Sequence, residues 1–256
     1  NNRAKTFGIR FEEPAFDEGE FQNQMVKFLG IEHSKVLATN ELIGASLARM
    51  LWHCEKPILR SAPVPLYLLS NLVHSQSYKV VLTGEGADEV FGGYNIFRET
   101  KVRDFWARQP DSQYRGLLVG KLYPYIFDDP RLQEMQRAFF SSGLDKHGHP
   151  FFSHLVRWQN SSKIGTFISK DHCTDGGLGS RMEELSAFVP RDFSNWESLA
   201  KAQYIEMLLF LSGYLLSSQG DRVAMAHSVE IRLPYLDFRL LDLMGRVPAK
   251  LKIMGL

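Results

Sequence analysis

The sequence predicts an α/β fold in which a parallel sheet with helices on both faces is followed by a mainly helical half. Strand and helix patterns alternate over about the first 80 residues in the order β-α-β-α-α-β, the rhythm of a parallel sheet covered by helices. The apolar run Val80, Val81 and Leu82 is typical of a buried strand. Strand signals fade after Tyr94, so we divide the chain into an α/β part, residues 1–94, and a mainly helical part, residues 95–256.

The first strand and helix follow from local patterns near the start of the chain. Residues 6–11 mix β-branched and aromatic side chains in rough alternation, which indicates a strand. Asp17, with Glu20 three residues later, predicts the N-cap of a helix that ends at Gly30. The helix has one apolar face with spacing i, i+4, i+7, i+8, formed by Phe21, Met25, Phe28 and Leu29.

The next elements complete the alternation. Residues 34–38 are a second candidate strand, and residues 40–54 are predicted to form a helix. Pro65 suits the first turn of a helix over residues 66–74. Residues 79–83 return to a strand. The apolar face of the second helix consists of Ile43, Leu47, Met50 and Leu51.

An acidic, glycine-bearing turn follows the third strand. In parallel sheets, ligands bind beyond the carboxyl ends of the strands, where this turn lies. Gly84 and Gly86 let the backbone turn tightly and approach a ligand. Three carboxylates follow within five residues: Glu85, Asp88 and Glu89. Oxygen ligands of this kind suit a phosphate-bound cation such as Mg²⁺, and a solvated acidic turn is the alternative.

The second half is predicted from weaker patterns. Residues 132–140, 199–216 and 236–244 have helical periodicity, and residues 141–150 are typical of a loop. Residues 161–179 are polar and contain glycines, which indicates either a mobile loop near a site or an ordinary connection.

A second charged stretch, residues 221–237, interleaves charges with apolar residues. Charges close to a core are usually paired, so Glu230, Arg232 and Asp237 are interpreted as an ion-pair network that fixes the helical half. We expect Arg222 to lie near a phosphate or a carboxylate.

Other chemistries find less support in the sequence. His147 and His149 have no third ligand nearby for zinc, and the adjacent His172 and Cys173 rarely face each other as a base and a nucleophile must. No Walker A sequence occurs, and the turn at Gly84 lacks the third glycine of a dinucleotide-binding fingerprint.

Composition is that of an ordinary globular protein, with 44% hydrophobic and 23% charged residues. A net charge of +1 argues against bulk nucleic acid or an anionic membrane surface as partners. Cys54 and Cys173 match no metal-ligand spacing and are expected to be free thiols in a reducing compartment. With no long apolar run, we expect a cytoplasmic protein, and both ends look cut from a larger parent protein.

Two stretches resemble the signatures of the glutamine-dependent asparagine synthetases. These are residues 83–94, Thr-Gly-Glu-Gly-Ala-Asp-Glu-Val-Phe-Gly-Gly-Tyr, and the charged stretch 221–237, in the family's order. The resemblance covers the synthetase domain and implies an adenine nucleotide alpha hydrolase-like fold. It also implies a ligase in which ATP and Mg²⁺ activate the side-chain carboxylate of aspartate as β-aspartyl-AMP. Ammonia, supplied by a glutaminase domain outside this chain, would then displace AMP to give asparagine. A homodimer stays open.

The resemblance assigns roles to five residues of the nucleotide-binding part. The backbone of Ile9 would hold the adenine, and Thr83 and Gly84 would contact the nucleotide. Glu85 matches the acid required to form the adenylate, and Asp88 matches a Mg²⁺ ligand.

Departures from the family pattern limit the resemblance. The Ser-Gly-Gly-Leu-Asp-Ser pyrophosphate loop expected before Thr6, the N-terminal cysteine nucleophile and a lysine expected after Leu256 are all outside this sequence. We therefore expect the fragment to be inactive alone. Residues 215–220 lack an acidic residue that many members carry, which leaves the acceptor open. One alternative is therefore an amidotransferase acting on another carboxylate, such as a sugar acid or a β-lactam precursor. A separate alternative is a non-catalytic scaffold that has lost ATP binding, against which the intact Glu85 and Asp88 count.

Overall fold

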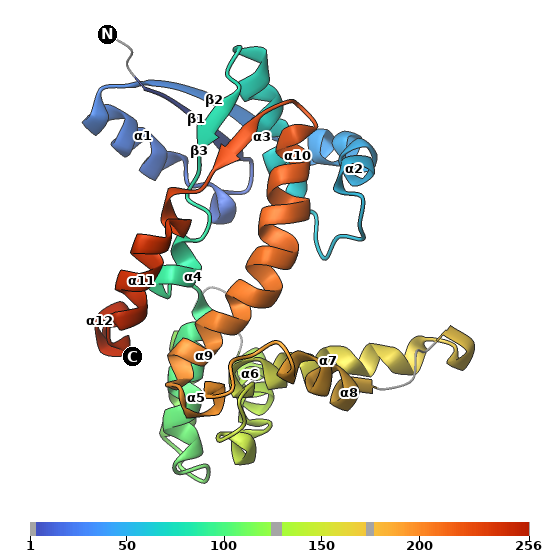
Figure 1. Ribbon diagram of the computed structural model, residues 1–256, viewed down its shortest axis with the longest axis vertical. Helices are drawn as coiled ribbons and strands as arrows, with labels where there is room; N and C mark the ends of the chain where they lie inside the picture. Colours follow the sequence, from blue (N-terminus) through green and yellow to red (C-terminus); the bar gives the residue numbers. More distant parts are fainter. Residues whose placement is uncertain (1–3, 124–129, 173–176, 256) are drawn as a thin grey trace. The chain divides into compact units, whose positions relative to one another are not determined.

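The computed structural model describes residues 4–123, 130–172 and 177–255 (Figure 1). The chain forms two compact units. The first unit contains the residues up to Gly86 together with Leu208–Asp237, and the second contains Ala87–Met207 and the residues from Phe238 onward. Strands occur in the first unit and the second is helical, in keeping with an α/β protein. The division at residue 94 into a nucleotide-binding and a helical part concerns function and stays a prediction.

In the first unit, β1 (Lys5–Phe11) and β2 (Glu32–Ala38) pair in parallel, with Ile9 opposite Val36 (Figure 1). Helices cover both faces of this pair. A Cβ on Gly8 would lie 2.4 Å from the Gln22 side chain of α1 (Gly19–Leu29). The neighbouring residue Ile9 packs into the core on the other side. That core is formed with α2 (Asn40–Cys54) and α3 (Pro63–Ser75), and the predictions for these elements are confirmed.

Two apolar clusters hold the first unit together. The larger joins α2, α3 and α10 (Arg222–Met225), and its buried members are Ala38, Met50, Cys54, Val64, Tyr67, Leu68 and Val223. In the smaller, the buried residues Val73, Ala224 and Val229 contact Phe7, Val81 and Ile231, one residue from each of three strands. The returning segment Leu208–Asp237 therefore completes the core of this unit.

The third strand differs from its prediction. β3 (Val80–Leu82) pairs in parallel with β4 (Glu230–Arg232), a strand that the sequence analysis missed. The described residues thus form two two-stranded sheets instead of one larger sheet. The expected burial of β3 is wrong, because Val80 is 38% and Leu82 72% exposed. A paired strand satisfies an edge of its neighbour, whereas the faces are buried only by elements packed on the sheet, and in the described part of the chain Val81 alone of β3 packs into an apolar cluster.

Asp17 is not the N-cap of the first helix. The cap is Glu18, which makes no side-chain capping bond. Asp17 instead accepts hydrogen bonds from Arg10 Nε at 2.7 and 2.9 Å and from the Phe11 amide at 3.2 Å. Hydrogen bonding to the Arg10 guanidinium lowers the pKa of Asp17 to about 2. The charge-assisted pair with Arg10 is the strongest of these interactions, ahead of the backbone amides of Phe11 and Gly19 that the carboxylate also meets.

Within the described ranges, the second unit is built from helices around two further clusters. Its α-helices are α4 (Ala87–Phe91), α5 (Asn95–Ala107), α6 (Pro130–Ser141), α7 (Phe152–Ser162), α8 (Gly177–Ser186), α9 (Ser198–Ile205), α11 (Phe238–Arg246) and α12 (Ala249–Lys252). The helices expected at 132–140 and 236–244 are confirmed as α6 and α11. Helical turns occupy most of the expected loop 161–179, of which residues 173–176 lie outside the described part.

The helix expected at 199–216 changes its hydrogen-bonding register. α9 is followed by a π-helical segment, Glu206–Asp221, which leads into α10. π-helical hydrogen bonding is rare in proteins, and single π-turns within α-helices are frequently found at functional sites. At its end, a Cβ on Gly220 would lie 2.8 Å from the backbone oxygen of Leu215. None of the helices in the described ranges has the length and apolar character needed to cross a membrane.

Candidate active site

The pairing of β3 with β4 brings the two sequence motifs together. Val81 lies opposite Ile231, and the Thr83 amide donates to the Arg232 oxygen at 3.0 Å. Because the strands are parallel, the loops that follow them leave the same edge of the sheet. The loop containing Glu85 therefore meets the stretch after β4, although the two are far apart in sequence.

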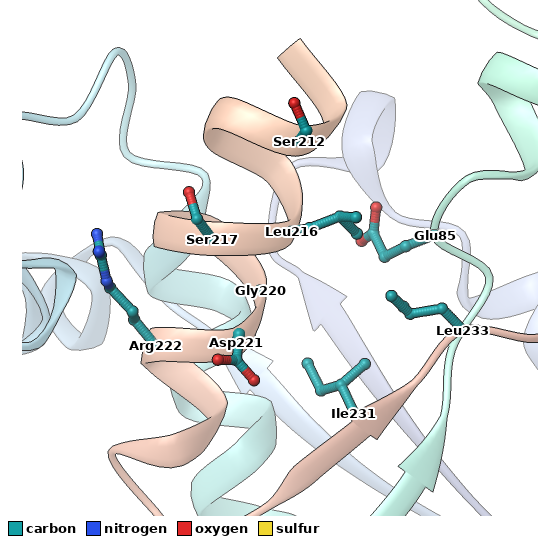
Figure 2. A pocket seen from close by; sticks show the side chains of 9 residues that line it. All are labelled: Glu85, Ser212, Leu216, Ser217, Gly220, Asp221, Arg222, Ile231 and Leu233. Carbon is teal, nitrogen blue, oxygen red and sulfur yellow. The ribbon is translucent and has the colours of Figure 1, made fainter. Parts of the chain in front are cut away.

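A cavity of about 380 Å³ lies at this edge. Figure 2 shows Glu85 and Leu216 pointing toward one another across it, with Asp221 and Ile231 lower in the view. The lining comes from the Glu85 loop, the π-helical segment, α10, β4 and the residue after β4: Glu85, Ser212, Leu216, Ser217, Gly220, Asp221, Arg222, Ile231 and Leu233. The site thus combines carboxylates and hydroxyls with an aliphatic wall.

Gly86 is the glycine that shapes the loop beside Glu85. Its φ is +91°, in the region that favours glycine, and a Cβ there would lie 2.3 Å from the Leu236 side chain. Gly84 differs from the expectation for this turn. It has no positive φ, and an added Cβ would meet no described atom within 4 Å. The tight turn therefore depends on Gly86.

Thr83 and Ile9 belong to the same unit but do not line this cavity. The buried Thr83 hydroxyl has no hydrogen-bond partner among the described residues, which fits a side chain that awaits a polar ligand. The Ile9 carbonyl accepts a hydrogen bond from Gln22 Nε2 at 3.1 Å. The nucleotide contacts assigned to Ile9, Thr83 and Gly84 stay predictions.

Arg222 meets a carboxylate, that of Glu55, at 3.5 Å from its Nε. Its Nη1 also donates to the backbone oxygen of Cys54 at 2.8 Å. In Figure 2 the Arg222 side chain extends away from Glu85, while Asp221 points toward Ile231. Of the expected ion-pair network, Glu230 and Arg232 do pair, at 2.8 Å. Both are more than half exposed, so this pair adds little to stability.

Asp88 and Glu89 lie in α4, at the start of the second unit. Asp88 is exposed, whereas Glu89 is 1% exposed and accepts a hydrogen bond from the Tyr94 hydroxyl at 3.1 Å. The grouping of Glu89 with the accessible carboxylates is therefore wrong. Consecutive side chains of a helix point about 100° apart around its axis, so these two neighbours meet different surroundings.

The donor set around Asp88 fits Mg²⁺ only as part of a phosphate complex. No group of three His, Cys, Asp or Glu residues in the described ranges could enclose a metal ion. Mg²⁺ is commonly held by one or two carboxylates together with substrate phosphates and water, for which one exposed carboxylate suffices. A Cβ on Gly93 would lie 2.0 Å from Asp88 Oδ1, so the missing side chain leaves room for this carboxylate.

Sequence reasoning missed the aliphatic and hydroxyl lining: Leu216, Ile231, Leu233, Ser212 and Ser217. In the second motif only the charged residues were interpreted as functional, and β4, with three residues, is too short to give a strand pattern. The alternation of charged and apolar residues over 230–233 was the available signal.

Comparisons with known proteins identify relatives. A family model described as asparagine synthase matches residues 1–256. Asparagine synthetase (glutamine-hydrolyzing) 1 of Bacillus subtilis (strain 168) is 28% identical over 250 residues, which cover 97% of this chain and 37% of that protein. A putative asparagine synthetase (glutamine-hydrolyzing) of Mycobacterium bovis is 29% identical over 256 residues, 99% of this chain and 37% of that protein.

A third relative has a different name. Amidase chry2 of Gibberella zeae is 29% identical over 265 aligned positions, covering 97% of this chain and 38% of that protein. The chain therefore spans 37–38% of the length of these relatives.

Proposed function

Because the chain belongs to the asparagine synthase family, we propose that it is the synthetase part of a ligase-type amidotransferase that activates a carboxylate with ATP. This proposal depends on one observation: Glu85 of the first motif lines the same cavity as Asp221 and Arg222 of the second. The adenine nucleotide alpha hydrolase-like fold is part of this proposal and is supported by the parallel strands with helices on both faces of β1 and β2.

The proposed reaction has two steps. A carboxylate oxygen of the acceptor attacks the α-phosphorus of ATP, and the bond to pyrophosphate breaks. Ammonia then attacks the acyl carbon, loses a proton, and AMP leaves. When bound, Mg²⁺ would neutralise charge on the phosphates.

Residues of this chain have separate parts in that scheme. Glu85 would act from the cavity wall in formation of the adenylate, and the turn at Gly86 fixes where its side chain emerges. Thr83 would contact the nucleotide through its hydroxyl, which has no partner among the described residues. Asp88 would hold the cation through its exposed carboxylate. The aliphatic wall of Leu216, Ile231 and Leu233 would border the reacting groups.

Aspartate is the first acceptor to test, because the names of two relatives point to asparagine synthesis. A second candidate is another carboxylate, such as a sugar acid or a β-lactam precursor. The lack of an acidic residue in 215–220 favours this candidate, and the aliphatic lining by Leu216, Ile231 and Leu233 suits the less polar β-lactam precursor better than a hydroxylated sugar acid. The amidase name of a third relative agrees with it only loosely.

Pyrophosphate release by the parent protein tests this proposal. It would be measured with ATP and Mg²⁺, with and without L-aspartate, for wild type and Glu85→Gln. We expect acceptor-dependent release that falls about 100-fold or more in the variant, the size typical of losing one positioned catalytic group. Glu41→Gln is the matched control, because Glu41 is exposed in the first turn of α2 and does not line the cavity.

The outcomes separate the readings. Pyrophosphate release that requires aspartate would support asparagine synthesis. Pyrophosphate release that occurs with another carboxylate, but not with aspartate, would identify that carboxylate as the acceptor. A scaffold would release no pyrophosphate and would gain no thermal stability from nucleotide. If the protein binds nucleotide, a nucleotide concentration of 100 times the dissociation constant should raise its free energy of unfolding by about 2.7 kcal/mol.

A further inference from the structure

The short helix α4 carries Asp88 and cannot satisfy its own last carbonyl groups. It contains five residues, Ala87–Phe91. The backbone amides of Gly92 and Gly93 both donate to the backbone oxygen of Asp88, each at 2.9 Å. The carbonyl oxygens of Glu89 and Val90 are therefore left without these donors, and both residues are only 1% exposed. Buried carbonyls at a helix end need a partner from elsewhere.

Gln203 of α9 supplies that partner. Its Nε2 donates to the Glu89 oxygen at 2.6 Å and to the Val90 oxygen at 3.0 Å. The Gln203 side chain lies in the interior of the second unit, with the residue 5% exposed. A primary amide has two N–H donors, so this one group satisfies both carbonyls at once. The result is a clamp between α9 and the end of α4.

Lys252 holds the other side of the same amide. Its Nζ donates to Gln203 Oε1 at 3.1 Å. Because an ammonium group can only donate, this contact directs the amide oxygen toward Lys252 and the amide nitrogen toward α4. The neighbouring Ile253 lies 3.3 Å from where a Cβ on Gly92 would be, so the segment after α12 also packs on the turn after α4.

The clamp acts at one end of a single helical turn, and Asp88 lies on that turn. The backbone oxygen of Asp88 accepts the hydrogen bonds that form the turn at Gly92 and Gly93. The carboxylate oxygen Oδ1 of the same residue occupies the space that a side chain on Gly93 would fill. A rotation of α4 would therefore break the hydrogen bonds from Gln203 and, at the same time, move the Asp88 carboxylate. Backbone and carboxylate are thus coupled within five residues.

We propose that Gln203, oriented by Lys252, is the positioning residue for Asp88, fixing its carboxylate for the phosphate-bound Mg²⁺ by holding the carbonyl end of α4. This inference rests on the proposed function for the role of Asp88. It rests only on the contacts above for the clamp itself.

The test uses the parent protein and two substitutions at position 203. Gln203→Leu removes the amide, and Gln203→Glu keeps an acceptor for Lys252 but removes the donor to α4. Gln136→Leu is the matched control, because Gln136 is 4% exposed and its Nε2 has no hydrogen-bond partner among the described residues. Asp88→Asn serves as the reference for loss of the carboxylate.

Two measurements are made. Amide hydrogen exchange in the metal-free, nucleotide-free protein reports the hold on residues 87–93. The Mg²⁺ concentration that gives half-maximal pyrophosphate release reports the position of the carboxylate. We expect both Gln203 variants to exchange about tenfold faster in this segment, and to need about tenfold more Mg²⁺, with a smaller change in kcat. Gln136→Leu should change neither quantity.

The outcomes distinguish the inference from the function it rests on. A wild-type protein that releases no pyrophosphate with any acceptor would overturn the proposed function, while the exchange data still decide whether Gln203 holds α4. An active wild type whose Mg²⁺ dependence changes in Asp88→Asn, but not in the Gln203 variants, would overturn the inference. So would unchanged exchange in residues 87–93.

Discussion

At the scale of single residues, the acidic turn shows how burial and backbone geometry separate groups that look alike in the sequence. Glu85 lines a cavity, Asp88 is exposed, and Glu89 is buried against the Tyr94 hydroxyl. These three carboxylates fall within five residues, yet only two of them are accessible to a ligand.

The two glycines of this turn give a matched pair of substitutions. Gly86→Ala should lower the free energy of unfolding by about 1–3 kcal/mol, because alanine is strained at positive φ and its Cβ meets Leu236. Gly84→Ala should change it by no more than about 0.5 kcal/mol, since an added Cβ has open space there. Denaturant unfolding of the parent protein measures both. A Gly86→Ala change of no more than about 0.5 kcal/mol would show that the turn does not depend on Gly86.

At the scale of elements, the π-helical segment Glu206–Asp221 supplies much of the cavity lining. The hydroxyls of Ser212 and Ser217 bond back to the backbone oxygens of Leu208 and Gly213. Gly220 lies where a side chain would meet the backbone oxygen five residues earlier. The register of this segment therefore decides where Asp221 and Arg222 enter the site.

A second matched pair tests that register. Gly220→Ala should destabilise the protein by about 1–3 kcal/mol, because backbone cannot move aside as a flexible side chain does. Gly213→Ala, in the same segment with open space around it, should stabilise by about 0.5–1 kcal/mol through helix propensity. Thermal unfolding and hydrogen exchange over residues 206–221 measure the two effects. A neutral Gly220→Ala would mean that the segment readily adopts another register.

Element-level prediction succeeded where periodicity was long and failed where contacts decide. The apolar face of α1 correctly indicated a helix, yet Phe21 is 73% and Phe28 85% exposed. The pattern shows that a helix has such a face, but not which surface covers it. For β3 and β4, three residues each are too few for any pattern to reveal their pairing.

At the scale of the whole molecule, each unit has cores of its own. The clusters around Met50 and Val73 lie in the first unit, and those around Phe97 and Trp106 lie in the second. The chain leaves the first unit at Gly86 and returns to it at Leu208, so the motif that ends at Asp237 packs with the residues that open the chain.

Separate cores predict separable destabilisation. Phe97→Ala, at a site that is 0% exposed, should lower the free energy of unfolding by about 3–5 kcal/mol and speed amide exchange in residues 87–207. Met50→Ala, equally buried in the first unit, should lower it by about 2–5 kcal/mol and speed amide exchange in residues 1–86 and 208–237. Exchange mass spectrometry of the parent protein measures both. Faster exchange throughout the chain in either variant would show that the units unfold together.

The sequence by itself determined the α/β class, the order of the first strands and helices, the family, and the two motifs that lie near the candidate site. These depend on local periodicity, turn residues and contiguous signatures, which neighbouring residues encode. Only the tertiary structure decided that β3 pairs with β4, that Asp17 binds Arg10, that Glu89 is buried, and that Gln203 meets α4. Those outcomes depend on contacts between residues distant in the chain, or on which of two partners binds more strongly, and no local pattern encodes either.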